Sequence, residues 1–153
     1  MRVYLVQHGT PVPKEKNPDR PLSDRGRYDV ERAAAFLQKA GVRVGAVYHS
    51  GKTRAEQTAE ILSERLCAGG FALQRRGLAP LDDVEDIARY IGELDDDLMI
   101  VGHLPHLNKL VSRLVTGKSE GQVVMFQQAG VCCLTRNEMG GWSVVWMIVP
   151  EIV

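Results

Sequence analysis

The stretch Val3–Thr10, VYLVQHGT, is the part of the sequence from which the fold can first be inferred. Its first four residues are apolar and mostly β-branched or aromatic, which is the composition and length of a buried strand. The run stops at Gln7-His8-Gly9, where the glycine allows the chain to turn sharply. His8 is therefore predicted at the carboxyl end of a strand, where open α/β sheets bind their ligands. We infer that the chain holds His8 in place and brings positive charge to it.

The composition is that of an ordinary globular protein. The 153 residues are 44% hydrophobic and 25% charged, and 19 basic residues balance 19 acidic ones. This length indicates one domain over residues 1–153. A formal net charge of zero argues against a general nucleic-acid or membrane-surface binder, because such proteins carry a basic excess.

The chain shows no sign of a membrane or secretory segment. No apolar run approaches the roughly 18 residues of a membrane span, and the N-terminus lacks the apolar region of a signal peptide. Cys67 stands alone in a helical pattern, and Cys132-Cys133 are neighbours in a strand-like run, so no CxxC motif exists. We expect a cytoplasmic protein with buried structural cysteines.

Strand-like and helical segments alternate along most of the chain. Strands that alternate with helices predict an α/β fold with three layers (α/β/α), in which a mostly parallel central sheet has helices on both faces. The last two strands add an antiparallel C-terminal pair. The predicted segments are a strand at Val3–Val6, a helix from Ser23 to Gly41, a strand at Val42–Tyr48, a helix containing Ala55–Leu66, a short strand at Phe71–Leu73, a helix at Val84–Leu94, a strand at Leu98–Val101, a helix from Pro105 to about Val115, and strands at Gly130–Asn137 and Trp142–Val149.

Two predicted strands end in a histidine, His8 and His103. Because the carboxyl ends of parallel strands lie at one edge of a sheet, the two rings can converge. A third strand leads into a helix that brings Arg54, and with it Lys52, to the same edge, where helix-start amides favour an anion. The planar guanidinium of Arg54 can grip phosphate oxygens through several donors. The sequence therefore predicts a phosphate site.

Several segments resemble the histidine phosphatase superfamily, also called the phosphoglycerate mutase-like family. The greatest likeness is to its short bacterial branch, the SixA-type phosphohistidine phosphatases. Each motif alone is weak, but their order and spacing are specific, and the likeness spans nearly the whole chain. The segments are VQHG at 6–9, RPLS at 20–23, RAEQTA at 54–59, VGHLP at 101–105, MF at 125–126 and the closing strand pair, which ends near Pro150.

The resemblance implies that His8 is a nucleophile that becomes phosphorylated. Its neutral imidazole attacks phosphorus, while the other ring nitrogen donates to a carbonyl, that of Gly9, which sets the tautomer. Arg54 and His103 would hold the transferring phosphoryl group, with His103 as a cation.

The resemblance also implies further contacts to the phosphate. The Leu104 amide adds a donor, and Arg20 reaches the phosphate or the approaching substrate. Phosphoryl transfer depends mostly on positioning and charge stabilisation, so a pocket of fixed donors suffices without a metal or another cofactor.

Position 7 departs from the family pattern. The usual triplet is Arg-His-Gly, and this chain has Gln7 in place of the arginine. This removes a fixed cation, and the loss of one transition-state donor can cost about a hundredfold in rate. Lys52 lies two residues before Arg54, where it can replace the missing charge. Whether it does so stays open from the sequence alone.

No residue stands out as a general acid. Asp82, Asp83 and Glu85 are the nearby candidates, but a carboxylate run in a loop is more often solvated surface. A leaving imidazole takes up a proton more readily than an alkoxide does, so the missing acid favours a P–N substrate. The chain between Leu66 and Leu98 leaves little room for a lid insertion, and an open site suits a phosphorylated protein better than a small sugar phosphate.

Simpler structural interpretations apply to other motifs. His103 and His106 are spaced like a metal pair but have no third ligand nearby. Gly51-Lys52-Thr53 resembles the end of a P-loop, but Ala46 occupies the position where that motif needs glycine. Trp142 and Trp146 lie four apart in a strand, which predicts core or sheet cover on one face.

Three functions remain to be distinguished. The leading hypothesis is a metal-independent phosphatase that acts on protein phosphohistidine, with a phosphorylated protein of the histidine-containing phosphotransfer type as its partner. The second is a small-molecule phosphomonoesterase or mutase. The third is a degenerate member that binds phosphorylated partners without turnover, which Gln7 favours and the retained His8 disfavours.

Overall fold

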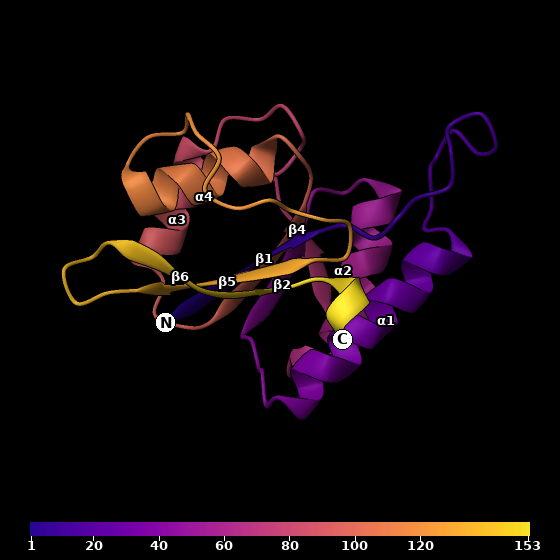
Figure 1. Cartoon of the computed structure of the whole chain (residues 1–153), viewed down its shortest axis with the longest axis horizontal. Helices are drawn as coiled ribbons and strands as arrows, with labels where there is room; N and C mark the ends of the chain where they lie inside the picture. The colour runs from indigo at the N-terminus through magenta and orange to yellow at the C-terminus, as the bar shows by residue number, and fades with distance from the viewer.

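The computed structural model describes all residues from Met1 to Val153 as a six-stranded sheet between two layers of helices (Figure 1). The predicted three-layer α/β fold is confirmed. None of the helices is long and apolar enough to cross a bilayer. The elements are β1 (Arg2–Gln7), α1 (Asp24–Lys39), β2 (Ala46–His49), α2 (Thr53–Leu66), β3 (Ala72–Gln74), α3 (Glu85–Glu93), β4 (Leu98–Gly102), α4 (His106–Thr116), β5 (Val131–Arg136), β6 (Trp142–Ile148) and a 3₁₀-helix at Pro150–Ile152.

The strand order β3-β2-β4-β1-β5-β6 places the three predicted site strands side by side. Strands β3, β2, β4 and β1 are parallel, whereas β5 is antiparallel to β1 and β6 is antiparallel to β5. Val6 is level with Val101 in β4, and Val101 is level with His49 in β2. The residues that follow these three strands therefore meet at one edge of the sheet.

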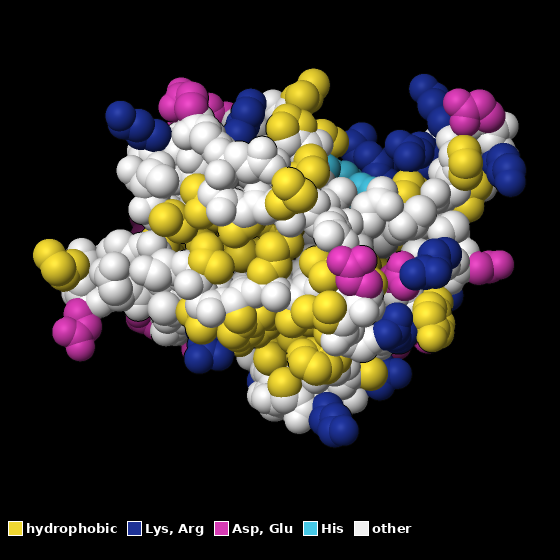
Figure 2. All heavy atoms as spheres, viewed as in Figure 1, with side chains coloured by type: hydrophobic (Ala, Val, Ile, Leu, Met, Phe, Trp, Pro, Cys, Tyr) yellow, Lys and Arg dark blue, Asp and Glu magenta, His cyan; other side chains and the backbone are white.

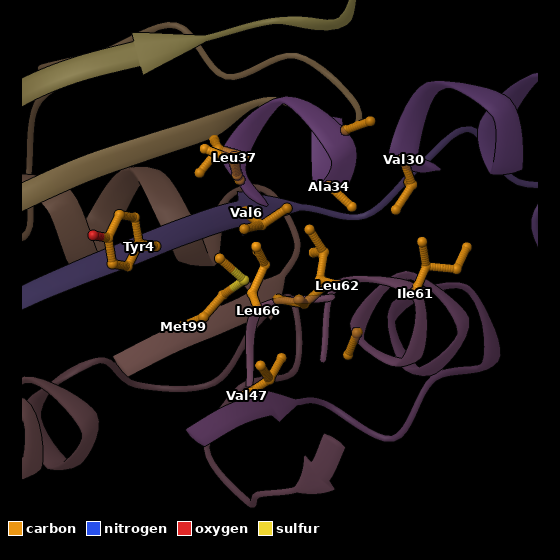
Figure 3. Close-up of a cluster of buried hydrophobic side chains, with 14 of the residues drawn as sticks. Tyr4, Val6, Val30, Ala34, Leu37, Val47, Ile61, Leu62, Leu66 and Met99 are labelled. Carbon is orange, nitrogen blue, oxygen red and sulfur yellow. The ribbon is translucent and has the colours of Figure 1, made fainter. Parts of the chain in front are cut away.

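The central strand β1 is buried on both faces, which explains its unbroken apolar run. Tyr4 and Val6 face the core beneath α1 and α2, whereas Val3 and Leu5 face the core beneath α3 and α4. Figure 3 shows the first core, where side chains of β1, α1 and α2 meet. Each fully buried side chain of this size contributes about 1.5–3 kcal/mol. The two cores hold β1 rigidly, and His8 follows it directly.

Gly9 is required for close packing rather than for a special backbone angle. It does not have a positive φ, so the predicted reason for this glycine was wrong. A Cβ at Gly9 would lie 2.8 Å from Cγ2 of Val30 and 2.9 Å from the carbonyl oxygen of Gly26. The glycine allows the loop after β1 to lie directly against α1.

The second and third strands are shifted from their predicted positions. β2 begins at Ala46 rather than Val42, because Val44 forms a bridge to Cys67 at the end of α2 and Gly45 bonds to Asp97. The backbone of residues 44 and 45 makes these bonds instead of pairing with β4, and the pairing begins at Ala46. β3 begins at Ala72, one residue after the predicted start.

The two tryptophans lie on opposite faces of β6, which corrects the prediction of a shared face. A β-bulge between Cys133 and Leu134 shifts the pairing so that these residues lie opposite Trp146 and Val144. An inserted residue reverses the alternation of side chains beyond it. Trp142 therefore packs in the α3/α4 core and Trp146 against the α1/α2 core.

The three cysteines are unpaired, and two of them are buried as predicted. Cys132 and Cys133 point into different cores. Burial raises the pKa of Cys132 to about 12 and that of Cys133 to about 11. Both are therefore thiols at neutral pH. Cys67, at the end of α2, is only half-buried.

Candidate active site

The backbone of His8 is fixed by both neighbouring strands. Its N–H donates to the carbonyl of Gly102 (3.1 Å), which ends β4, and its carbonyl accepts the N–H of Ala129 (3.2 Å), which precedes β5. The side chain is buried. His8 is therefore held at the carboxyl edge of the sheet, where the sequence predicts it.

The ring of His8 is held in one tautomer. Nδ1 lies 2.7 Å from the carbonyl oxygen of Gly9, and only an N–H can bond there. Nε2 accepts a hydrogen bond from Nε of Arg54 (3.2 Å), so it carries the lone pair. Burial, with the charges of Arg54 and Arg20, lowers the pKa of His8 to about 4, against the opposing effect of the Gly9 carbonyl. His8 is thus a neutral imidazole at pH 7.

His103 converges on His8 from the end of β4. The ring centroids are 5.0 Å apart, with the planes tilted by 52°. Nε2 of His103 lies 2.6 Å from the hydroxyl of Ser50, which follows β2 and also accepts the backbone N–H of Lys52. Sequence reasoning missed Ser50. The available signal was a hydroxyl at the end of the third strand that leads to this edge.

Without a bound phosphoryl group, the surroundings of His103 favour its neutral form, whereas the predicted cation concerns the site with a phosphoryl group bound. Burial lowers the pKa of His103 to about 3, and His8, Arg54 and Lys52 act in the same direction. The charges contribute to the lowered pKa of His103 because this edge of the sheet carries basic groups. A phosphoryl dianion at the same place acts in the opposite direction and raises the pKa of His103.

Arg54 is positioned by the first turns of α2. The hydroxyl of Thr58 donates to the carbonyl of Arg54 (2.7 Å) and accepts the N–H of Gly9 (3.0 Å). This residue ties α2 to the loop that carries His8. Burial lowers the pKa of Arg54, with a smaller effect from the Arg20 charge, and the guanidinium remains charged at neutral pH.

We refer to His8, His103 and Arg54 as the cluster. The other predicted contacts lie around it. Arg20 has a φ of +49° and is close enough for its charge to lower the pKa of His8 and Arg54. Lys52 is exposed at the start of α2, and its charge lowers the pKa of His103. Leu104 follows His103 and is partly exposed. All three lie next to a residue of the cluster or act on it electrostatically.

Comparisons with known proteins agree with this geometry. The model of the family "Histidine phosphatase superfamily (branch 1)" matches residues 3–69. Phosphohistidine phosphatase SixA of Escherichia coli is 26% identical over 155 residues, which are 98% of this chain and 94% of SixA. The similarity to this family model thus covers residues 3–69, and the similarity to SixA extends over nearly the whole chain. The predicted resemblance is confirmed.

Solved structures extend the comparison to the fold. The structure of the protein histidine phosphatase SixA complexed with tungstate matches this chain with a TM-score of 0.88 and 26% identity, covering 99% of both chains. A phosphoserine phosphatase of Entamoeba histolytica in complex with 3-phosphoglyceric acid has a TM-score of 0.74 at 12% identity over 95% of both chains, a likeness of fold alone. Together, the similarities support a phosphatase of the histidine phosphatase type.

Gln7 faces a polar hollow beside the cluster. The hollow measures about 450 Å³, and Gln7 shares its lining with Thr10, Arg25 and Asp29. No hydrogen bond links Gln7 to His8, Arg54 or His103, and its buried Oε1 has no protein partner. The side chain thus makes no direct contribution to the charge at the cluster.

The three carboxylates considered as acids lie in different surroundings. Glu85 forms an ion pair with Arg113 (2.8 Å) on α4, so it is held away from proton transfer. Asp82 accepts the N–H of Ala79, and Asp83 accepts that of Glu85, so both stabilise their own loop. Asp82 and Asp83 also line a hollow of about 480 Å³ that includes Ser50. Asp86 lines the same hollow, which reaches the histidine pair through Ser50, the hydrogen-bond partner of His103.

No metal-binding cluster accompanies the histidine pair. No three His, Cys, Asp or Glu side chains converge in a way that can hold a metal ion. His106, the second member of the spaced pair, is fully buried at the start of α4, and burial lowers its pKa. His106 is thus a neutral core residue on the α4 side of the sheet.

Proposed function

We propose that this protein removes the phosphoryl group from protein phosphohistidine through a covalent phospho-His8 intermediate. The observation that carries the proposal is the lone pair on Nε2 of His8. It faces the guanidinium of Arg54, and the ring of His103 lies 5.0 Å from that of His8. A neutral nucleophile beside an anion-binding group is what attack on a phosphoryl group needs.

In the first step Nε2 of His8 attacks phosphorus. The new P–N bond forms as the bond to the substrate's imidazole nitrogen breaks, and that nitrogen takes up a proton from solvent water. The proton stays on Nδ1 of His8, which donates it in a hydrogen bond to the Gly9 carbonyl. Arg54 and His103 stabilise the charge on the phosphoryl oxygens, and the Leu104 amide and Arg20 are proposed as further donors.

In the second step water attacks phosphorus and breaks the bond to Nε2 of His8. Inorganic phosphate leaves, and His8 returns to its neutral form. Both steps use protein donors alone, so we propose that no metal or cofactor takes part.

The surroundings of the site support a protein substrate. The chain from 67 to 97 forms only β3, a loop and α3, so we propose a single domain without a lid over residues 1–153. The related SixA proteins are named for phosphohistidine. The proposed partner is a phosphorylated protein of the histidine-containing phosphotransfer type, met in the cytoplasm, and neither nucleic acid nor membrane is a proposed partner.

Two alternatives can be tested together with this proposal. The similar fold of a phosphoserine phosphatase keeps a small phosphomonoester possible. Gln7 supplies no cation to the cluster and lines a separate hollow, which favours a protein that binds phosphate without turnover.

Phosphate release from three donors separates these functions. The donors are a phosphorylated histidine-containing phosphotransfer domain, free N-phosphohistidine and a phosphomonoester such as p-nitrophenyl phosphate. We expect release from both P–N donors and little from the ester. Release from the ester alone would favour the second function. Binding of the phosphodomain without release from any donor would favour the third.

Lys52 is proposed to supply the charge that Gln7 lacks. Lys52→Ala is expected to weaken phosphate binding and to lower kcat/KM about two- to tenfold, the range for a partly screened charge near an anion. Inhibition by inorganic phosphate and steady-state turnover measure both effects. Lys39→Ala, which removes an exposed lysine at the far end of α1, serves as the control. Unchanged values for Lys52→Ala would show that the missing charge is not replaced.

A further inference from the structure

Three large apolar side chains are exposed on loops that adjoin the carboxyl edge of the parallel strands. The exposed fractions are 85% for Leu81, 37% for Leu104 and 73% for Met125. They come from three loops, β3–α3, β4–α4 and α4–β5. Clustered exposed apolar side chains commonly mark sites of contact with other proteins. We refer to these three residues as the apolar rim.

Each loop of the apolar rim leads directly to the cluster. Leu104 follows His103. The loop that contains Leu81 shares a hollow with Ser50, through Ala79 and Asp82. The loop of Met125 continues to Ala129, whose N–H bonds to the carbonyl of His8.

Basic groups accompany the apolar rim. Arg20, Lys52 and Arg54 all act electrostatically on the histidine pair. Figure 2 shows the histidine atoms in cyan with yellow hydrophobic side chains on one side and dark blue Lys and Arg groups behind and to the other side. The surface around the nucleophile therefore combines apolar and cationic areas, and the carboxylates of Asp82 and Asp83 lie on the side of Ser50.

We propose that the apolar rim is the docking surface for a folded acidic protein whose phosphohistidine is bordered by apolar side chains. This inference rests on the proposed function of the site. The rim spans three loops beyond the phosphate cluster, more than a small phosphate ester covers. The adjoining cations favour a partner with acidic groups beside its phosphoryl group, because opposite charges steer association and fix its orientation.

Two exposed methionines provide a matched test. Met139 is 96% exposed at the tip of the β5–β6 hairpin, which lies at the opposite end of the sheet from the site (Figure 1). The wild type, Met125→Asp and Met139→Asp are each assayed on free N-phosphohistidine and on a phosphorylated histidine-containing phosphotransfer domain. The two donors break the same P–N bond, so their ratio isolates the protein contacts.

For the wild type we expect kcat/KM to be at least about a hundredfold higher for the domain than for the free amino acid. Met125→Asp lowers the value for the domain about tenfold, mainly by raising KM, and leaves the amino acid unchanged. Met139→Asp changes neither. Added salt lowers the domain's advantage, because it screens the charge attraction.

Equal values for the two donors in the wild type, or equal effects of the two aspartate substitutions, would overturn the docking surface while phosphatase activity remains. Failure to hydrolyse either P–N donor would instead contradict the proposed function. Sedimentation shows whether a second copy of the chain covers the rim. A dimer that Met125→Asp dissociates would also overturn the proposal. Met125→Ser separates the effect of the new charge from any loss of folding, which thermal unfolding monitors.

Discussion

Replacing His8 by alanine is expected to lower phosphate release from protein phosphohistidine by a factor on the order of 10⁴ or more, the scale seen when a nucleophile is lost. The reason is structural, because His8 carries the only ring lone pair that faces Arg54. His103 cannot take over, since its Nε2 is bonded to the hydroxyl of Ser50.

The intermediate itself can be measured. Rapid quenching of the wild type with a ³²P-labelled phosphodomain should capture a labelled protein whose phosphate is stable in alkali and lost in acid, as expected for a phosphoramidate. His8→Ala should carry no label. Because Nδ1 of His8 is occupied by the Gly9 carbonyl, the phosphoryl group is expected on Nε2.

His106→Asn is the control for this experiment. It removes a different buried histidine, which lies on the α4 side of the sheet. The variant should keep the label on His8, and thermal unfolding reports any loss of stability. Turnover of His8→Ala within tenfold of the wild type, or a label that survives in it, would exclude the covalent mechanism.

The convergence of the site could be predicted because it depends on strand ends. Apolar runs before His8 and His103 predict parallel strands, and parallel strands share one carboxyl edge. The position of Arg54 could be predicted because it lies at the start of the helix that follows the third of these strands. The pairing of His49 with Val101 in the structure brings that helix to the same place. Here local patterns and topology agree, so the convergence of His8, His103 and Arg54 could be predicted from the sequence.

Ser50 and the charge of His103 could not be predicted in this way. A serine after a strand carries no pattern of its own, and its bond to His103 depends on how β2 and β4 align. The neutral state of His103 depends mainly on burial, which is a property of the packed structure. The ion pair of Glu85 with Arg113 likewise joins residues far apart in the chain.

The bulge in β6 gives a different reason for failure. Counting by twos placed Trp142 and Trp146 on one face, but the extra residue opposite Cys133 and Leu134 reverses the alternation. Nothing in the local sequence marks the bulge. The requirement for glycine at position 9 was predicted for an incorrect reason. The glycine is needed because Val30 and Gly26 of α1 pack closely against it, and the local sequence does not show this contact.

Arg54→Ala is expected to lower kcat/KM by about 10²–10³, the cost of removing one main donor to transition-state charge. The residue performs two functions that can be separated. Its guanidinium offers several donors to phosphoryl oxygens, and its charge lowers the pKa of His8. The first function affects the rate at the optimum pH, and the second affects the pH at which activity is lost.

The direction of the pH effect follows from the nucleophile. His8 reacts only when Nε2 is unprotonated, so activity falls as the pH drops through its pKa of about 4. Removing the Arg54 charge raises this pKa, and the acid limb of kcat/KM moves to higher pH. Burial remains the larger cause of the lowered pKa, so the limb should stay below the ordinary value of 6.5.

Two further variants distinguish charge from geometry. Arg54→Lys keeps a positive charge but loses the planar set of donors, so it should hold the acid limb near its original position while recovering little of the rate. Arg65→Ala removes an exposed arginine from the last turn of the same helix and should change neither quantity. If Arg54→Ala kept the acid limb in place and lost less than threefold in kcat/KM, Arg54 could not be the group that holds the phosphoryl oxygens. The basic edge would then act only through long-range attraction of the substrate.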